Sequence, residues 1–254
     1  MLRTQDGGRT FEDLTPQDMP QPPGGGVFCQ IDFASSTVGA VMGIDHYEVD
    51  VFRMGHTKSF LAVTQDGART WRRIEFPSDI LFDSFDWVDD RTILVAGQFL
   101  WRSDDYGVTW KRVNRLPRGG IRLTVDSSSS SRLWWVAPPD LYRSDDTGAT
   151  WNEVPFPADF SVENGFFFEG GLAWVSGFLP TRDSALLATV NGGHSWTRLY
   201  AVQGRKRLQP FFFTPARGWL LVSKLVQPDD KTVELWSTWD GGRKWQLQSG
   251  EIEK

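Results

Sequence analysis

The octapeptide SDDTGATW at residues 144–151 decides the expected fold, because close copies of it recur along the whole chain. The six copies are TQDGGRTF (4–11), TQDGARTW (64–71), SDDYGVTW (103–110), SDDTGATW (144–151), TVNGGHSW (189–196) and TWDGGRKW (238–245). Their starting positions differ by 60, 39, 41, 45 and 49 residues. A repeat of roughly 40–50 residues with strand-like flanks is typical of propellers and other repeat arrays.

Each copy lies between two short strand-like segments. Around the fourth copy these are LYRS (141–144) and TWNEV (150–154), so the copy is expected to form the turn of a β-hairpin. Two more strand-like segments precede each hairpin, for example GFFFEG (165–170) and LAWVSG (172–177). The sequence therefore predicts five four-stranded units, or blades, between residues 27 and 248.

The expected fold is all-β, a single propeller domain over residues 1–254. Residues 1–14 supply only one hairpin, residues 15–26 form a Pro- and Gly-rich linker, and residues 249–254 form a short polar tail. We expect six blades with an irregular or incomplete first blade, and a truncated seven-bladed parent is the alternative. The strands of a blade are labelled a to d from the propeller axis outward, so each octapeptide joins strands c and d.

Composition limits the function classes. The net charge of −5 argues against a general nucleic-acid binder, and no apolar run approaches the length of a membrane span. Cys29 is the only cysteine, so an internal disulfide is excluded. No signal peptide precedes the first octapeptide, which indicates a cytoplasmic protein at face value. A periplasmic or secreted protein is expected instead if the N-terminus is truncated.

The third residue of the octapeptide is expected to close the turn, because a short Asp or Asn side chain accepts hydrogen bonds from nearby backbone N–H groups. These residues are Asp6, Asp66, Asp105, Asp146, Asn191 and Asp240. The final aromatic residue is expected to pack in the core, and the tryptophans concerned are Trp71, Trp110, Trp151, Trp196 and Trp245. A feature repeated six times serves the architecture, so we predict no catalytic residue among them.

The octapeptides resemble the Asp-box, or bacterial neuraminidase repeat, with the pattern Ser/Thr-x-Asp-x-Gly-x-Thr/Ser-Trp. The resemblance extends over the whole chain in six copies. It departs from the pattern at Phe11, Ala68, Asn191 and Lys244. The resemblance implies a β-propeller of sialidase-like fold whose boxes have a structural role and face away from the ligand-binding side.

The d–a and b–c loops should share the side opposite the boxes. Two d–a loops are rich in basic residues, and Arg182 belongs to a b–c loop. The candidate binding residues are Arg115, Arg118, Arg122, Arg182, Arg205, Lys206 and Arg207. Guanidinium groups pair well with carboxylates and phosphates, which favours a protein partner or an anionic ligand. A basic surface that serves solubility alone is the alternative.

The longest expected b–c loop is IDHYEVDVFRMGHTKS (44–59). Its candidate binding residues are Asp45, His46, Tyr47, Arg53 and His56. Two histidines and a carboxylate could hold a metal ion. Their ten-residue separation is not diagnostic, however, so we predict neither a metal nor a cofactor and expect this loop to contact a partner.

The layout of the blades is similar to that of the photosystem II stability and assembly factor group, in which an aromatic strand and a Gly-Trp strand precede the box. PFFFTPARGWLLVS (210–223) followed by LWSTWDGGRKW (235–245) carries this layout. The resemblance implies a non-catalytic, bacterial scaffold that binds another protein, as an assembly or accessory factor. The alternative is a sialidase-like glycoside hydrolase, for which Tyr47, with Glu48 beside it, and Asp45 are the candidates.

Overall fold

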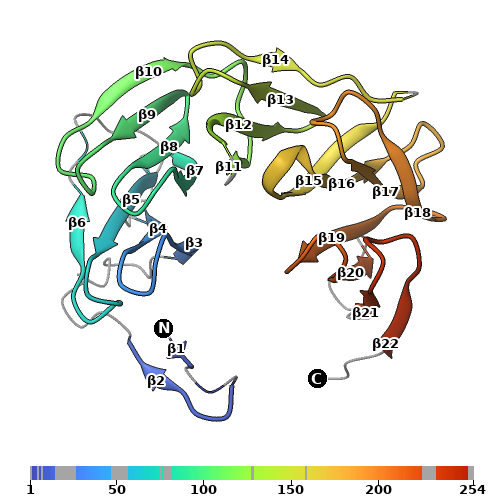
Figure 1. Cartoon of the computed structure of the whole chain (residues 1–254), viewed down its shortest axis with the longest axis horizontal. Coiled ribbons are helices and arrows are strands. Elements are labelled where there is room, and N and C mark those ends of the chain that lie inside the picture. The colour runs from blue at the N-terminus through green and yellow to red at the C-terminus, as the bar shows by residue number, and fades with distance from the viewer. Residues whose placement is uncertain are drawn as a thin grey trace, which may run out of the picture. The chain divides into compact units, whose positions relative to one another are not determined.

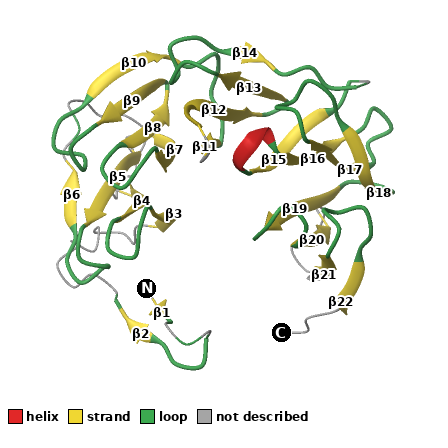
Figure 2. Cartoon of the chain, in the orientation of Figure 1, coloured by secondary structure: helices red, strands yellow, loops and turns green. Residues whose placement is uncertain are grey.

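The computed structural model describes residues 2–4, 6, 8–14, 27–46, 57–74, 76, 82–126, 129–157, 159–224 and 233–250. The predicted linker at 15–26 lies outside the described residues, as do Tyr47, Arg53 and His56. Within the described part, the regular structure is β-strand apart from one short 3-10 helix, η1 (Glu169–Gly171) (Figure 2). The chain divides into two compact units, Met1–Gly119 and Gly120–Lys254.

The first unit contains one two-stranded and two four-stranded antiparallel sheets among its described residues (Figure 1). The two-stranded sheet pairs β1 (Leu2–Arg3) with β2 (Glu12–Asp13). The next sheet consists of β3 (Val27–Phe33), β4 (Gly39–His46), β5 (Thr57–Thr64) and β6 (Arg72–Ile74). The third consists of β7 (Phe82–Trp87), β8 (Ile93–Gly97), β9 (Phe99–Ser103) and β10 (Lys111–Arg115).

The second unit contains three four-stranded antiparallel sheets in its described residues. The first consists of β11 (Arg122–Asp126), β12 (Ser129–Ala137), β13 (Asp140–Ser144) and β14 (Asn152–Glu153). The second consists of β15 (Ser161–Phe167), β16 (Ala173–Phe178), β17 (Ser184–Thr189) and β18 (Thr197–Val202). The third consists of β19 (Lys206–Phe212), β20 (Gly218–Lys224), β21 (Val233–Thr238) and β22 (Gln246–Gly250).

In every sheet the spatial order of the strands follows the order of the sequence. The all-β prediction and the five four-stranded units are therefore confirmed, and the β1–β2 hairpin fits the predicted partial first blade. Strand β22 reaches Gly250, two residues into the segment predicted to be a polar tail. Consecutive antiparallel strands can be joined directly as hairpins, which is why sequence order and spatial order coincide.

Strand β16 shows how the sheets pack in the second unit. Val175 belongs to the apolar cluster shared with the β11–β14 sheet, where Trp134 is fully buried. On the opposite face of β16, the ring of Trp174 stacks on Phe212 of β19 at a centroid distance of 3.7 Å. A strand covered on both faces is apolar at consecutive positions, as the run from Ala173 to Val175 is.

Each of the five box tryptophans is only partly buried, and four of them pack against apolar core clusters, namely Trp71, Trp110, Trp196 and Trp245. Trp110 packs on Phe76 at 4.5 Å between ring centroids, and Trp196 packs on Phe156 at 4.8 Å. Both phenylalanines precede strand a of their own blade. A residue that follows an exposed turn gains cover on one side only, whereas Trp134 in a central strand is enclosed.

The strands also extend further than the apolar segments predict. Arg122 lies in β11, Lys206 and Arg207 lie in β19, and Arg115 ends β10, so these four basic residues are in strands and not in loops. Ladder hydrogen bonds join backbone groups whatever the side chains, so polar residues can continue a strand. The long b–c loop shrinks to residues 47–56 for the same reason, because β4 ends at His46 and β5 begins at Thr57.

Candidate functional site

The Asp-boxes are closed hydrogen-bonded turns. In the box at 144–151, the Ser144 hydroxyl donates to Asp146 Oδ1 at 2.7 Å and accepts from the backbone N–H of Gly148 at 2.8 Å. Asp146 Oδ1 also accepts from the Thr150 N–H at 2.8 Å, and Oδ2 accepts from the Thr150 hydroxyl at 2.6 Å. Both carboxylate oxygens are therefore used inside the turn, as the sequence predicts.

These hydrogen bonds change the acidity of the box aspartates. The threonine four residues on, through its hydroxyl and its backbone N–H, lowers the pKa of Asp6, Asp66, Asp105 and Asp146 to about 2. The Lys244 N–H likewise lowers the pKa of Asp240. A carboxylate that stays ionised at neutral pH is a poor general acid, so the geometry supports a structural role for the boxes.

The two ends of each blade in the second unit are distinguished by hydrogen bonds between turns. At one end the boxes bond to the a–b turns, since Gly192 N–H donates to Gly171 O at 2.9 Å and Gly241 N–H donates to Ala216 O at 2.8 Å. At the other end the b–c and d–a connections meet, and Ser184 Oγ donates to Gly204 O at 3.1 Å. These are called the box end and the loop end.

A basic loop cluster, defined as Arg182, Arg205 and Lys206, lies at the loop end of the second unit. The guanidinium of Arg205 stacks over the ring of Phe178 at 4.4 Å. Arg182 is exposed and has φ of +68°, in a turn closed by its N–H bond to Leu179 O at 2.8 Å. The backbone hydrogen bond therefore fixes the position of the Arg182 main chain, from which its exposed side chain extends.

Asp183 joins the two loops that carry the cluster. Its Oδ1 accepts from the Gly204 N–H at 3.0 Å and its Oδ2 accepts from the Thr181 hydroxyl at 2.8 Å. The Gly204 hydrogen bond is the main reason why the pKa of Asp183 is lowered. Both oxygens of this carboxylate are engaged by the loops themselves. Arg182 and Arg205 therefore extend from two loops that Asp183 holds together.

A second set of contacts borders the cluster, and sequence reasoning missed it. Lys206 Nζ lies 3.8 Å from Glu234 Oε1, and the Trp236 indole N–H donates to Glu234 Oε2 at 2.9 Å. The ring of Tyr200 lies 6.3 Å from that of Trp236. Burial, and then the charge of Glu234, raise the pKa of Tyr200. Because 34 residues separate Tyr200 from Glu234, no local sequence pattern marks the pair.

The other predicted binding residues are not brought into this cluster. Arg115 and Arg118 are exposed in the first unit, whereas Arg122 is exposed on β11 in the second. Arg207 is exposed on β19 next to Lys206, and strand alternation directs these two side chains to opposite faces. Asp45 and His46 lie in β4, and their side chains are outside the described part.

The described residues contain no group of three or more His, Cys, Asp or Glu side chains that could hold a metal ion. The His46 side chain and His56 lie outside that description, so the prediction that the 44–59 loop holds no metal ion stays a prediction. No helix among the described residues is long and apolar enough to cross a membrane.

Comparison with known proteins identifies the repeat and the fold. Residues 100–113 match the BNR-Asp box repeat family model. No curated protein matches the chain in sequence. Among solved structures, the YCF48 protein from Cyanidioschyzon merolae aligns with 91% of this chain and 86% of its own, at 12% identity and a TM-score of 0.57.

Two further structures are similar. A GH74 xyloglucanase from Xanthomonas campestris aligns with 84% of this chain at 18% identity and a TM-score of 0.57. The aligned part is 37% of the xyloglucanase, so this chain spans about a third of that enzyme. A structure described as YCF48 bound to D1 peptide aligns with 89% of this chain and 82% of its own, at 15% identity and a TM-score of 0.47. The repeat and the two alignments with a TM-score of 0.57 give the fold, and activity has to be argued from the residues.

Proposed function

We propose that this Asp-box β-propeller protein is a non-catalytic scaffold that binds a protein partner or an anionic ligand through its loop end. The observation that carries the proposal is the basic loop cluster, in which Arg205 stacks on Phe178 at 4.4 Å and Arg182 projects from a strained turn. Stacking leaves the edge N–H groups of a guanidinium free to pair with a carboxylate or phosphate.

The surroundings of the cluster support binding more than catalysis. Asp183 is ionised and held by backbone and hydroxyl donors, so it cannot readily deliver a proton. Tyr200 has a raised pKa, which keeps its hydroxyl neutral, whereas a tyrosine nucleophile needs an anionic or readily deprotonated oxygen. Arginine side chains on loops that Asp183 joins fit a surface that recognises an acidic segment of another protein.

The fold is compatible with an assembly or accessory role. The similar structure of YCF48 from Cyanidioschyzon merolae covers most of both chains, and the other YCF48 structure is described as bound to a D1 peptide. If this chain recognises a peptide or protein, it would do so with a fold similar to that of YCF48. The chemistry of its loops, not the fold, selects the partner.

Hexaglutamate and hexalysine peptides, titrated by calorimetry, test this proposal. We expect hexaglutamate to bind and affinity to fall as salt rises, because the contacts are charge pairs. The double variant Arg182→Glu/Arg205→Glu should weaken binding at least tenfold. Arg69→Glu, a change at an exposed box residue of the first unit, is the matched control and should leave affinity unchanged. Equal binding of both peptides, or an unaffected double variant, would remove the loop end from consideration.

The second candidate is a sialidase-like glycoside hydrolase. The electrostatic effect of Glu234 on Tyr200 favours it, since such an enzyme uses a tyrosine and a glutamate as its nucleophile pair. The pair expected from sequence is Tyr47 with Glu48 beside it, and Asp45 is the further candidate. Hydrolysis of aryl glycosides and sialosides is the direct assay. Turnover abolished by Tyr200→Phe, Tyr47→Phe or Asp45→Asn would replace the scaffold proposal, and absence of turnover agrees with it.

A further inference from the structure

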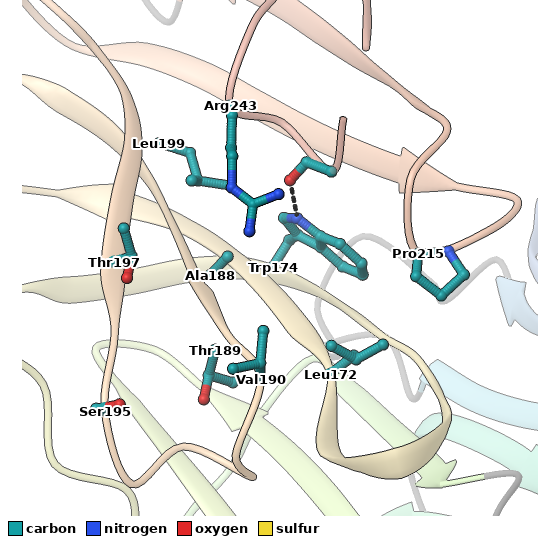
Figure 3. Close-up of a pocket in the computed structure, with 11 residues that line it drawn as sticks. Leu172, Trp174, Ala188, Thr189, Val190, Ser195, Thr197, Leu199, Pro215 and Arg243 are labelled. Carbon is teal, nitrogen blue, oxygen red and sulfur yellow. Dashed lines mark hydrogen bonds between the residues drawn. The ribbon is translucent and has the colours of Figure 1, made fainter. Parts of the chain in front are cut away.

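A pocket of about 140 Å³ opens at the box end of the second unit, between the boxes at 189–196 and 238–245 (Figure 3). Its wall includes Trp174, whose indole N–H donates to Gly241 O at 3.0 Å. Leu172 and Leu199 border the same space, and Arg243 extends into it from the turn between β21 and β22 (Figure 3). The pocket thus combines an apolar wall with one cation.

The second residue of the box is where this region departs from its sister boxes. In the box at 103–110 this residue is Asp104, which pairs with Arg102 at 2.7 Å. In the box at 144–151 it is Asp145, which pairs with Arg132 and Arg143. The two boxes at the pocket carry Val190 and Trp239 instead, and these side chains are 72% and 63% exposed. The box turn needs neither residue, because its hydrogen bonds come from other positions.

The charge of the boxes changes in the same place. The boxes at 103–110 and 144–151 each contain two carboxylates and no cation, whereas the box at 189–196 contains no carboxylate. The box at 238–245 contains one carboxylate, Asp240, together with Arg243 and Lys244. Arg243 donates through Nη1 to Asp240 O at 3.2 Å, and in the described part of the chain no carboxylate pairs with it. The surface around the pocket is therefore apolar and cationic where the boxes at 103–110 and 144–151 are acidic.

We propose that this pocket binds an extended peptide, which inserts one apolar side chain against Leu172 and Leu199 and pairs a neighbouring carboxylate with Arg243. A volume of about 140 Å³ suits a single side chain, since pockets for whole small molecules span roughly 300–1,000 Å³. The Trp174 N–H is already satisfied by Gly241, and the residue is 3% exposed with its ring stacked on Phe212. The apolar contact therefore comes from Leu172 and Leu199, and Arg243 supplies the polar contact.

The surface continues beyond the pocket along the last blade. The guanidinium of Arg217 lies 4.7 Å from the centroid of the Trp239 ring. Arg217 belongs to the a–b turn between β19 and β20, and this turn is bonded to the box because the Gly241 N–H donates to Ala216 O. The exposed ring of Trp239 and the guanidinium of Arg217 can form a second apolar and cationic contact with the part of the peptide that lies outside the pocket. This surface is at the opposite end of the blade from the basic loop cluster, so the two sites can be tested separately.

The probe for the test is acetyl-Gly-Leu-Asp-Gly-amide, titrated into the full chain and followed by the NMR signals of the Arg243 side chain and the Trp174 indole. We expect saturable shifts of both signals. Arg243→Gln and Val190→Asp should each weaken binding at least tenfold, the second because it places a carboxylate at the pocket that repels the carboxylate of the peptide. Arg69→Gln and Gln65→Asp alter the same two positions in the box at 64–71, and they should leave the titration unchanged.

Several outcomes would overturn the proposal. If acetyl-Gly-Leu-Lys-Gly-amide shifted the signals as strongly as acetyl-Gly-Leu-Asp-Gly-amide, Arg243 would not select a carboxylate. Acetate saturating the site at the same concentrations would show a small-anion site with no role for the apolar side chain. Dimerisation of the chain that Val190→Asp abolishes, measured by sedimentation, would assign the pocket to a second copy of this protein.

Discussion

The boxes at 144–151 and 189–196 form the same turn from different residues. Asp146 accepts from the Thr150 N–H at 2.8 Å, and Asn191 accepts from the Ser195 N–H at 3.0 Å through its amide oxygen. The hydrogen bond between the two side chains, of the third and the seventh box residue, is also kept, although donor and acceptor exchange roles when Asn replaces Asp. Asn191 Nδ2 donates to the Ser195 hydroxyl at 2.9 Å, whereas Asp146 accepts there. The turn therefore depends on hydrogen-bond geometry and not on the negative charge.

The outward positions of the same two boxes differ in character. Asp145 forms ion pairs with Arg132 and Arg143, whereas Val190 is 72% exposed. The comparison teaches that a box has two separable parts. The inward residues maintain the blade and vary little, and the outward residues are free to acquire a binding role.

The largest effect should come from breaking the inward part at Gly193. This residue has φ of +83°, and a Cβ there would lie 2.7 Å from Val154 Cγ1. Gly193→Ala should cost about 2–4 kcal/mol of unfolding free energy, since left-handed backbone strain adds to overpacking. Urea denaturation measures this cost. Gly119→Ala, which would place its Cβ in open space, should change almost nothing, and equal losses in the two variants would refute the steric explanation.

The box carboxylate should show the next largest effect. Asp105 accepts from the Thr109 N–H at 2.8 Å and from the Thr109 hydroxyl at 2.7 Å. Asp105→Ala removes both acceptors and should cost roughly 1–2 kcal/mol in denaturant titrations. Asp105→Asn should cost clearly less, because Asn191 already serves in a sister box. A loss in Asp105→Asn as large as in Asp105→Ala would mean that the charge itself holds the turn.

The same carboxylates give the protein a specific acid sensitivity. Their folded pKa of about 2 lies below the ordinary value of 3.8, so the ionised form is favoured by folding. This contribution is complete above about pH 4 and is lost as the pH falls toward 2. We expect the thermal midpoint to fall over that window, and Asp66→Asn/Asp105→Asn to fall less steeply. Parallel curves for the two proteins would contradict the assignment.

A gain of stability is expected at Ala68, which occupies the position of Gly193 in its own box. Ala68 is buried and has φ of +72°, a conformation that a side chain disfavours. Ala68→Gly should therefore raise the unfolding free energy by up to about 1 kcal/mol. Ala62→Gly, in the ordinary backbone of β5, is the control and should lower it. If Ala68→Gly is also destabilising, loss of buried surface outweighs relief of strain.

The smallest effect on stability should follow a change at an outward position. Val190→Asp should alter the unfolding free energy by less than about 0.5 kcal/mol, because the side chain is exposed and the turn is unaffected. Asp145→Val should cost slightly more, since it removes two surface ion pairs. Both are measured by the same denaturant titrations. A loss above about 2 kcal/mol in Val190→Asp would show that inward and outward parts are not separable.

Local patterns were sufficient to predict the strands and the boxes. Hydrogen bonds within a box span at most four residues, so the octapeptide at 144–151 contains all the groups that close its turn. The central strands were also readable, since β16 is a short apolar run. The ends of the strands were not, because Lys206 continues β19 through pairing with Lys224, a partner 18 residues away.

By itself the sequence determined the all-β repeat architecture, since six copies of a self-contained turn impose it wherever strands flank them. Only the tertiary structure decided which outlying residues meet. Arg205 finds Phe178, Tyr200 approaches Glu234, and Arg243 enters a pocket beside Trp174. These contacts join different blades or separate loops, and their partners depend on how neighbouring sheets pack, which no local spacing records.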